Sequence, residues 1–390
     1  MWYIKPDSRE EFVIGKRLNT YRNFYRRILI TVISILLIIT VFNVLIDPYI
    51  IFHTPTTKFS NVKPEAKRQE RMTKITEFKL DKRKIDTVFI GTSRVDWTFD
   101  TNYFNKITGK NASNMGIVGM NFNEYIEYTK ILMKIHPEIK NIYLGLDFSN
   151  FNKNIIDNNR FEGFNNKTNL TTSELATAFF STDTTVSSFI TISKNVKLKD
   201  LTKLYDKNGL IYMYDNENIE SIFQYAIKND LGKFKNYEIE NSYYDKLSEL
   251  NLYCKNKGIK LYIFHTEGHA VDLATIYLGG YWDIFTQWKK NLTKISDIYD
   301  FYYINEISTA PVKVGMKEFY DSIHGSPQTS NLIMDKMINN KGSYGRLNTQ
   351  KNIEELTKKD TKNLEIWMDK NPKWVKIIKE TKEEVEKDAI

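Results

Sequence analysis

The sequence predicts an α/β domain with a mostly parallel sheet, held at a membrane by one N-terminal helix. Three observations lead to this prediction. One long segment near the N-terminus is apolar and uncharged, short apolar runs alternate with helical patterns further along, and the composition can fill a large core. Of the 390 residues, 41% are hydrophobic and 14% aromatic, which provides enough buried area to offset the conformational entropy of a folded chain.

Residues 28–46 form the first predicted element, a transmembrane helix. They are 19 residues without a charge, and at 1.5 Å per residue such a helix spans about 28 Å, close to the ~30 Å hydrocarbon core. Arg26 and Arg27 precede the segment, which places the leader of residues 1–27 in the cytoplasm and the rest outside it. A cleaved signal peptide is the alternative, but its apolar core is usually about 7–15 residues and no small-residue cleavage site follows here. We expect an uncleaved single-pass anchor in the cell membrane.

The net charge of +8 is unevenly distributed along the chain. Residues 1–27 contain seven basic and three acidic residues, so the leader alone carries +4, which is half of the excess. Charge that lies outside the folded domain argues against a nucleic-acid partner. The single cysteine, Cys254, excludes an internal disulfide framework, and with only five histidines we expect neither a metal site nor a cofactor.

The exported part begins with residues 47–80, which mix prolines with a charge run, show no clear period and are interpreted as a stalk. The main domain follows at residues 81–340. Its predicted strands are short apolar runs, at residues 85–90, 112–117, 141–146, 260–264 and 301–304. Helical spacing of apolar residues appears at 122–135, 246–257 and 329–338. Strands that alternate with helices indicate a mostly parallel sheet.

Two segments interrupt or follow this alternation. Residues 151–240 are rich in Asn, Thr and Ser and are interpreted as an insertion, partly helical, that could cover the site. Residues 341–390 form a predicted helical C-terminal extension, in which Leu364, Trp367, Trp374 and Ile378 recur at roughly helical spacing. Packing against the domain is favoured for this extension, while its Trp and Lys content also suits a membrane surface.

Ser93 follows the first predicted strand of the domain, in the run Gly91-Thr92-Ser93-Arg94. A serine on a turn after a parallel strand lies at the edge where open α/β sheets bind ligands. Its hydroxyl can act as a nucleophile, and its own N–H can face an oxyanion. The alternative is a serine that only caps the next helix. Taken alone, the turn does not decide between them.

Asp321 and His324 lie near the end of the domain, three residues apart and before a predicted helix. An imidazole can accept the proton of a serine hydroxyl, and a carboxylate can fix the tautomer of that imidazole. His324 is the one histidine with an aspartate three residues before it and a predicted helix after it. The alternative is a surface Asp-x-x-His without a role in catalysis.

Together these residues resemble the SGNH (GDSL-like) hydrolase superfamily, and in particular a membrane-anchored bacterial branch of it. The resemblance covers about residues 84–340. It rests on five blocks in the family's order, at residues 88–94, 114–124, 144–151, 288 with 299–301, and 320–324. The family implies a flavodoxin-like three-layer α/β/α domain, here with one transmembrane helix and a helical C-terminal extension.

The resemblance also implies roles for individual residues. Ser93 would be the nucleophile, His324 the base and then the acid, and Asp321 the residue that orients the imidazole. Gly119 matches a glycine whose N–H joins that of Ser93 in the oxyanion hole. The family often adds an Asn donor where this chain has Asp147, and an ionised carboxylate cannot donate. Either Asp147 holds a neighbouring loop, or an amide such as Asn121 takes its place.

Two further residues are candidates for substrate binding. Arg94 could pair with an anionic group of a substrate, or it could form an ion pair with Asp96 or Asp147. His265 follows a predicted strand at the same sheet edge and could line the pocket. The nearby His269 shows that a histidine on this loop need not take part in chemistry.

Relatives in the anchored branch imply a function in the cell envelope. The first hypothesis is an O-acyltransferase that moves acetyl groups onto an exported polysaccharide through an acyl-serine, with a multi-span membrane O-acyltransferase as the partner that brings the acyl group. The second is an esterase or deacetylase that uses the same residues with water as acceptor. The third is a non-catalytic subunit that binds glycan or scaffolds an export complex.

Overall fold

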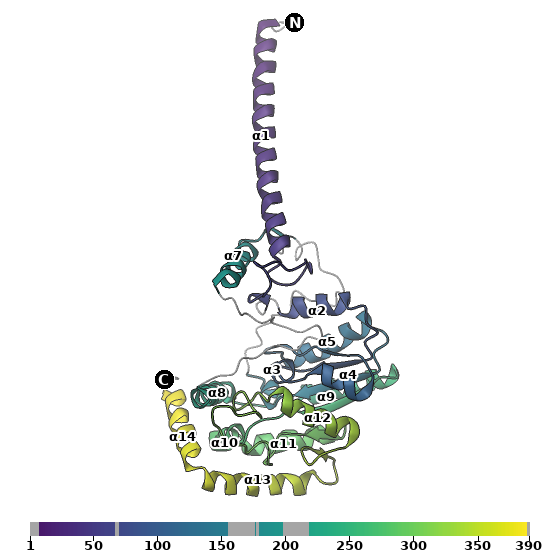
Figure 1. The fold of residues 1–390 in the computed structure, drawn as a ribbon, viewed down its shortest axis with the longest axis vertical. Helices are drawn as coiled ribbons and strands as arrows, with labels where there is room; N and C mark the ends of the chain where they lie inside the picture. The colour runs from purple at the N-terminus through teal and green to yellow at the C-terminus, as the bar shows by residue number, and fades with distance from the viewer. Residues whose placement is uncertain (1–7, 67–69, 155–175, 177–178, 198–217, 388–390) are drawn as a thin grey trace, which may run out of the picture. The chain divides into compact units, whose positions relative to one another are not determined.

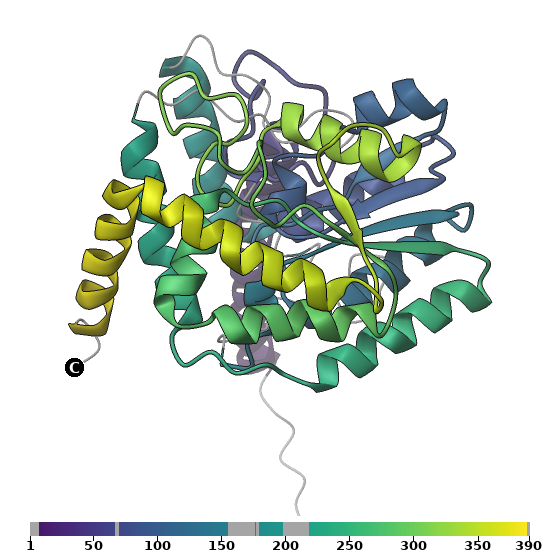
Figure 2. The ribbon, with the colours of Figure 1, turned by 90° about the horizontal axis from the view of Figure 1, so that it is seen from below.

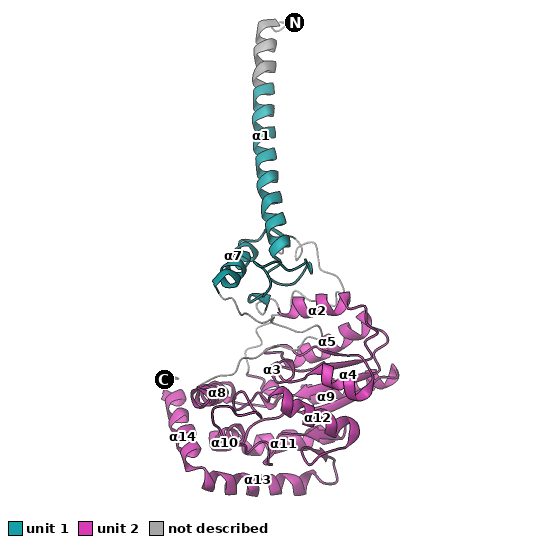
Figure 3. Cartoon of the chain, viewed as in Figure 1, with its two compact units in different colours: residues 1–69, 169–202 teal, residues 70–168, 203–390 magenta. Residues whose placement is uncertain are grey.

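The computed structural model describes residues 8–66, 70–154, 176, 179–197 and 218–387. These residues fall into two compact units (Figure 3). Unit 1 comprises Met1–Gln69 and Asn169–Thr202, and unit 2 comprises Glu70–Thr168 and Lys203–Ile390. The segment expected as one insertion, residues 151–240, is therefore divided between the two units. Residues 155–175 and 198–217 of it lie outside the described residues, so a role in covering the site stays a prediction.

Unit 2 is an α/β domain built on one mixed sheet. The strands are β1 (Thr87–Ile90), β2 (Ala112–Asn114), β3 (Asn141–Leu146), β4 (Lys260–His265), β5 (Ile298–Asp300) and β6 (Arg346–Asn348). They are ordered β2-β1-β3-β4-β5-β6 across the sheet. The first five strands pair in parallel and β6 pairs antiparallel with β5. β2 and β3 therefore lie on opposite sides of β1, and the chain reverses its direction across the sheet between them, which creates a switch point beside the end of β1.

Helices cover both faces of this sheet (Figures 1 and 2). Successive side chains of a strand point to opposite faces, and in β1 the buried Val88 and Ile90 join one core cluster whereas Phe89 joins the other. The first cluster includes residues of α2 (Glu70–Leu80), α5 (Phe122–Ile135), α8 (Ile219–Phe234), α9 (Ser242–Asn256), α10 (Ala270–Gly279) and α11 (Trp282–Thr293). The second includes residues of α3 (Ser93–Asp96), α4 (Thr101–Thr108) and α12 (Pro327–Asn339). A short 3-10 helix, η2 (Phe148–Phe151), follows β3.

Two strands differ from the prediction. The fifth strand is β5, at residues 298–300, and the more apolar residues 301–304 that follow are not in a strand. The strand β6 lies in the segment predicted to be purely helical, because its sequence, Arg-Leu-Asn, carries no apolar run. The C-terminal extension therefore begins inside the sheet. Its two helices, α13 (Ile353–Lys370) and α14 (Pro372–Lys387), bury Leu364, Trp367, Trp374 and Ile378 in the first core cluster, so they pack as expected.

The predicted stalk also differs from the structure. Its last part is the helix α2, which belongs to unit 2 and buries Ile75 and Phe78 against the core. Lys74 on the same helix is buried too and pairs with Asp96. One buried position of the helix is therefore a charged residue with a buried partner. For this reason the apolar residues of α2 do not show a clear helical period in the sequence.

Among its described residues, unit 1 includes the helices α1 (Ser8–Ile46) and α7 (Thr182–Lys197). Within α1, residues 19–46 are long and apolar enough to cross a membrane. Only 6% of the most apolar part of this segment is buried within the protein. A core helix would be covered by other parts of the chain, so the exposed apolar surface of α1 agrees with a membrane-spanning segment. The helix α7 packs against α1.

Candidate active site

Ser93 is the first residue of α3, directly beyond the end of β1. Thr92 caps the helix, and its side-chain oxygen accepts from the N–H of Arg94 at 3.3 Å. Gly91 allows the strand to pass close under the helix, because a Cβ there would lie 2.2 Å from a methyl carbon of Val95. The Ser93 side chain is half-buried. Its amide belongs to the first turn of a helix, whose N–H groups have no acceptor inside the helix.

A tight hairpin holds the other two residues of the predicted triad. Phe319 and Gly325 form an antiparallel bridge, and the Tyr320 N–H donates to the carbonyl of His324 at 2.9 Å. Ser326 then caps α12, whose first residue is a proline. A proline at this position and a serine cap both favour the start of a helix. The loop is therefore fixed on both sides of Asp321 and His324.

The three side chains form one continuous chain of hydrogen bonds. Nε2 of His324 lies 2.8 Å from Oγ of Ser93, and its Nδ1 lies 2.6 Å from Oδ2 of Asp321. The other oxygen of Asp321 accepts the backbone N–H groups of Ile323 at 2.7 Å and His324 at 2.8 Å. Burial raises the pKa of the Asp321 carboxyl, but the charge of His324 and these hydrogen bonds outweigh burial, so its pKa is below the ordinary value. Asp321 is therefore ionised and can orient the imidazole.

The ring of His324 is also held by an aromatic stack. The indole of Trp97 lies on it, with ring centroids 4.0 Å apart and planes inclined by 27°. His324 is buried, with 6% of its surface exposed. Trp97 follows α3, so the helix that presents Ser93 also supports His324. Nothing in the sequence marks this role, because a Trp four residues after a serine is unremarkable.

Asp147 holds the turn that presents Ser93. One of its carboxylate oxygens accepts from the hydroxyl of Thr92, and the other accepts from Thr266 Oγ1 at 2.5 Å. It lies at the end of β3, beside β1 in the sheet, and is buried. Of the two roles considered for Asp147, holding a neighbouring loop agrees with these contacts.

Arg94 points into the protein and makes ion pairs there. Its guanidinium donates to the carbonyl of Glu267 at 3.0 Å and to Asp272 at 3.3 Å, and it lies 3.8 Å from Asp147. Burial lowers the pKa of Arg94, but the surrounding acidic groups outweigh burial and raise it. Of the alternatives for Arg94, the structure shows the ion pair with Asp147, adds Asp272, and leaves Asp96 to Lys74.

Asn114 fixes the opposite side of α3. Its amide nitrogen donates to the carbonyls of Val95 and Phe99 at 2.9 and 3.0 Å. Gly116 follows and lies against α3, because a Cβ there would be 2.5 Å from the backbone nitrogen of Asp96. The N–H of Ile117 then donates to the carbonyl of Gly91 at 2.9 Å. The segment after β2 is therefore bound to the turn that carries Ser93.

Gly119 lies in the turn that this segment enters. It has a positive φ of 64°, and the N–H of Met120 donates to the carbonyl of Ile117 at 3.1 Å, as in a β-turn that favours glycine. The helix α2 holds this turn, since Glu70 accepts the N–H of Val118 at 2.8 Å. The structure thus brings Gly119 into the loop beside the nucleophile turn and explains its residue type by the turn.

Asn121 lies at the start of the helix that follows Gly119, and its part in an oxyanion hole stays a prediction. Its side-chain oxygen accepts the N–H of Glu124 at 2.9 Å, and Glu124 in turn accepts the N–H of Asn121 at 2.8 Å. This reciprocal pair is a capping box at the start of α5. The side-chain oxygen of Asn121 therefore caps this helix.

His265 does not line a pocket in this structure. Its side chain is completely buried, its Nδ1 lies 3.0 Å from Asp300, and its ring lies against Trp288. Burial lowers its pKa to about 4, although the hydrogen bond and charge of Asp300 act in the opposite direction. The residue is the last one of β4, at the ligand-binding edge, but its side chain turns to the side of the sheet that Trp288 covers.

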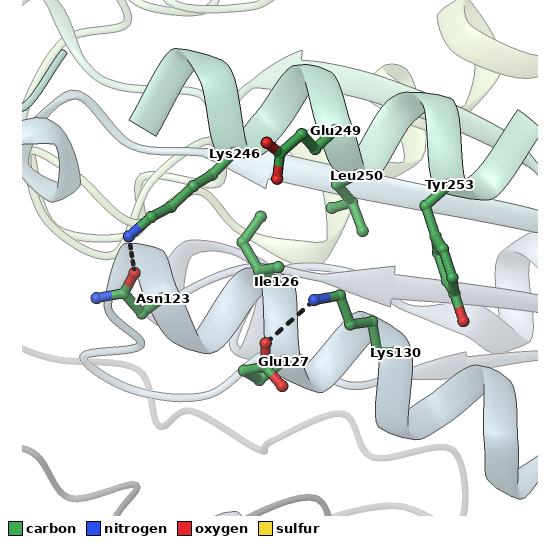
Figure 4. A pocket seen from close by; sticks show the side chains of 8 residues that line it. All are labelled: Asn123, Ile126, Glu127, Lys130, Lys246, Glu249, Leu250 and Tyr253. Carbon is green, nitrogen blue, oxygen red and sulfur yellow. Dashed lines mark hydrogen bonds and ion pairs between the residues drawn. The ribbon is translucent and has the colours of Figure 1, made fainter. Parts of the chain in front are cut away.

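A separate hollow of about 420 Å³ lies between α5 and α9 (Figure 4). Lys130 pairs with Glu127 along α5 at 3.2 Å, and Lys246 of α9 donates to Asn123 of α5 at 2.9 Å. It is lined by none of Ser93, Asp321 and His324. We therefore assign the candidate active site to the triad and not to this hollow.

Searches of protein-family models, of curated proteins and of solved structures each found no significant match to the chain. The site is therefore interpreted from its own geometry. Within the described part of the chain, no group of three or more His, Cys, Asp or Glu side chains is placed to hold a metal ion. Sequence reasoning missed Thr92, Asn114 and Trp97, which position the triad without reacting.

Proposed function

We propose that the chain is a serine-dependent O-acyltransferase of the cell envelope that acts outside the cytoplasmic membrane. The observation that carries this proposal is the chain of hydrogen bonds from Ser93 through His324 to Asp321. A hydroxyl next to an imidazole that is oriented by a carboxylate is the arrangement that activates serine for attack on an acyl group.

The reaction takes place in two halves. Oγ of Ser93 attacks the carbonyl carbon of the acyl donor while Nε2 of His324 accepts its proton. The tetrahedral intermediate then collapses, the leaving group takes that proton, and acyl-Ser93 remains. In the second half an acceptor hydroxyl gives its proton to His324 and attacks the acyl carbon. The second tetrahedral intermediate then collapses, and the leaving Oγ of Ser93 takes that proton from His324. The N–H groups of Ser93 and Gly119 stabilise the oxyanion in both halves.

We further propose that the domain belongs to the SGNH superfamily with a flavodoxin-like arrangement. The strand order β2-β1-β3-β4-β5 supports this, because it is the order of flavodoxin-like sheets, whose ligands bind at the β1/β3 switch point. Ser93 follows β1, and the Asp-x-x-His pair precedes α12. Both positions agree with the family pattern.

The exported polysaccharide is the proposed acceptor, and a multi-span membrane O-acyltransferase is the proposed partner that supplies acetyl groups. The apolar helix α1 supports a reaction at a membrane, since it keeps the protein where a membrane-borne donor is found. Arg26 and Arg27 support a cytoplasmic N-terminus and an external unit 2.

An esterase that removes acetyl groups would use the same triad with water as the acceptor. Acetyl content of the surface polymer in cells that carry Ser93→Ala distinguishes the two functions. We expect a loss of acetyl, whereas a gain would establish the esterase. Ser343→Ala is the matched control, because this serine is exposed and contacts Glu306 instead of the triad. Unchanged acetyl content in the Ser93→Ala strain would refute both and favour a non-catalytic glycan-binding or scaffolding role.

A further inference from the structure

Helix α7 of unit 1 has its polar and apolar sides reversed relative to the helices of a water-soluble domain. Its buried residues are Thr184, Ser187, Ser188 and Thr191, which follow one another at i, i+3, i+4 and i+7. Its opposite side, here called the outer face, exposes Val186, Phe189 and Val196 by 53%, 61% and 58%. A helix in water does the opposite, because burying apolar area is favourable.

The buried polar side of α7 makes hydrogen bonds to α1 and to the segment after it. Asn43 of α1 donates to Thr185 at 3.1 Å and accepts from Ser188 at 3.0 Å. The hydroxyl of Tyr49 donates to Asp183 at 2.5 Å. Asn43 is buried, so an amide inside an apolar helix is matched by the hydroxyls of α7. Such matching is required in a membrane, where water cannot satisfy a polar group.

The outer face continues the apolar surface of α1. The ring of Phe189 lies against Phe42, with centroids 4.9 Å apart. Phe42 is four residues before the end of the apolar segment at Ile46, which corresponds to about 6 Å along the helix axis. Amphipathic helices at a bilayer surface bury their apolar side by about 5–10 Å. The level at which Phe189 contacts α1 is therefore within the reach of acyl chains.

The charges of α7 are placed at its ends. Asp183 is in the first turn and Lys194 and Lys197 are in the last, and residues 184–193 between them carry no charge. Exposed lysines at one end suit anionic headgroups. Two more exposed aromatic residues belong to unit 1. Phe180 precedes α7 in the sequence and Phe59 lies in the segment after α1, and each is 43% exposed.

We propose that the outer face of α7 lies in the lipid of the membrane that α1 spans, so that unit 1 is embedded by two helices and not by one. The polar side of α7 faces Asn43, and Val186 and Phe189 contact acyl chains. This inference rests on α1 as a membrane-spanning helix and is independent of the chemistry at Ser93.

Spin-label accessibility tests the proposal on the full-length chain in vesicles of phosphatidylcholine and phosphatidylglycerol. The background variant is Cys254→Ala, which removes the buried native thiol. Labels are placed at Val186→Cys and Phe189→Cys. Leu37→Cys, 61% exposed in the apolar part of α1, is the lipid control, and Leu252→Cys, 58% exposed on α9, is the water control.

We expect labels at 186 and 189 to behave like the label at 37, with frequent collisions with oxygen and few with a water-soluble nickel chelate. The label at 252 should show the reverse. Nickel access at 186 and 189 equal to that at 252 would overturn the proposal. Protection from both reagents would also overturn it, because the face would then be covered by protein, such as a second copy of the chain.

A measurement without substitutions guards against variants that do not fold. The wild-type chain is illuminated in the same vesicles with a lipid that carries a diazirine on its acyl chain, and the modified peptides are identified by mass spectrometry. We expect modification within residues 186–196 as well as within α1. Modification of α1 alone would contradict the embedded position of α7.

Discussion

Two histidines of this protein have almost the same neighbours. Nδ1 of His324 lies 2.6 Å from Asp321, and Nδ1 of His265 lies 3.0 Å from Asp300. Each ring also packs on an indole, with centroids 4.0 Å apart at Trp97 and 4.6 Å apart at Trp288. Both belong to unit 2. An aspartate and an aromatic ring that orient an imidazole are therefore not, by themselves, a sign of catalysis.

The difference lies in the second ring nitrogen and in the charge around the aspartate. Nε2 of His324 meets the hydroxyl of Ser93, whereas Nε2 of His265 is buried without a partner in the described part of the chain. Asp321 accepts backbone N–H groups, but Asp300 is also bound by Lys289 at 3.0 Å and Arg346 at 2.7 Å. In the proposed mechanism the hydroxyl at Nε2 makes the His324 pair reactive, whereas Lys289 and Arg346 bind the carboxylate of the His265 pair.

The largest effect is expected from Ser93→Ala and His324→Ala. Each should lower the rate of acyl transfer by about 10⁴–10⁶-fold, and the double variant should lose little more, because the base has no task without its nucleophile. Both variants should keep the circular dichroism spectrum of the wild type. Near wild-type turnover by a folded His324→Ala protein would contradict a catalytic role for His324 and leave both histidines with a structural role.

Asp321→Ala should have a large but milder effect. The imidazole loses its orientation, while the oxyanion hole and the nucleophile remain, so a loss of about 10³–10⁴-fold in kcat is expected. The same assay on an ester surrogate measures it. A loss equal to that of Ser93→Ala would mean that Asp321 does more than orient His324.

Asp300→Asn should act on stability and not on chemistry. It leaves Lys289, which is completely buried, without its carboxylate, and breaking such a pair costs about 3–5 kcal/mol. Urea denaturation measures the free energy of unfolding, and turnover per folded molecule should stay near that of the wild type. A loss of turnover with unchanged stability would contradict this prediction, because it would mean that the Asp300–His265 pair takes part in the reaction.

A smaller effect is expected from pH. Burial lowers the pKa of His265 to about 4 in the folded protein, while the unfolded chain has the ordinary value of 6.5. Between these values the unfolded chain binds more protons at this residue. His265 therefore contributes a loss of about 3 kcal/mol of stability as the pH decreases from about 6.5 to about 4. His265→Gln should show a flatter dependence over this range. An equally steep pH dependence of stability in that variant would mean that groups other than His265 cause it.

The sequence pointed to the hydrogen-bonded triad more clearly than to the residues that hold it. A Gly-x-Ser turn after an apolar strand and an Asp-x-x-His before a helix are local patterns, so Ser93 and His324 could be named in advance. The sequence could not decide whether His265 faces a pocket or the core, because the two faces of a buried parallel strand look alike in sequence. The stacking of Trp97 on His324 depends on the hairpin at residues 319–325 lying against α3, which the local sequence does not indicate.

The fold was predictable where apolar runs were long. The helix at residues 122–135 has the predicted bounds, and β3 has them as well. The helix α2 was not predicted because Lys74 occupies one of its buried positions. The strand β6 was not predicted because three residues with polar neighbours show no period. Both depend on partners far away in the sequence, namely Asp96 and β5.

Labelling with a fluorophosphonate tests most directly whether Ser93, His324 and Asp321 form a working triad. The reagent forms a bond with a serine only when a base removes its proton. Applied to the full-length chain in detergent, it should modify Ser93 in the wild type and in His265→Gln, and modify neither His324→Ala nor Ser93→Ala. Labelling of Ser93 that persists in folded His324→Ala protein, or that disappears in folded His265→Gln protein, would contradict the account.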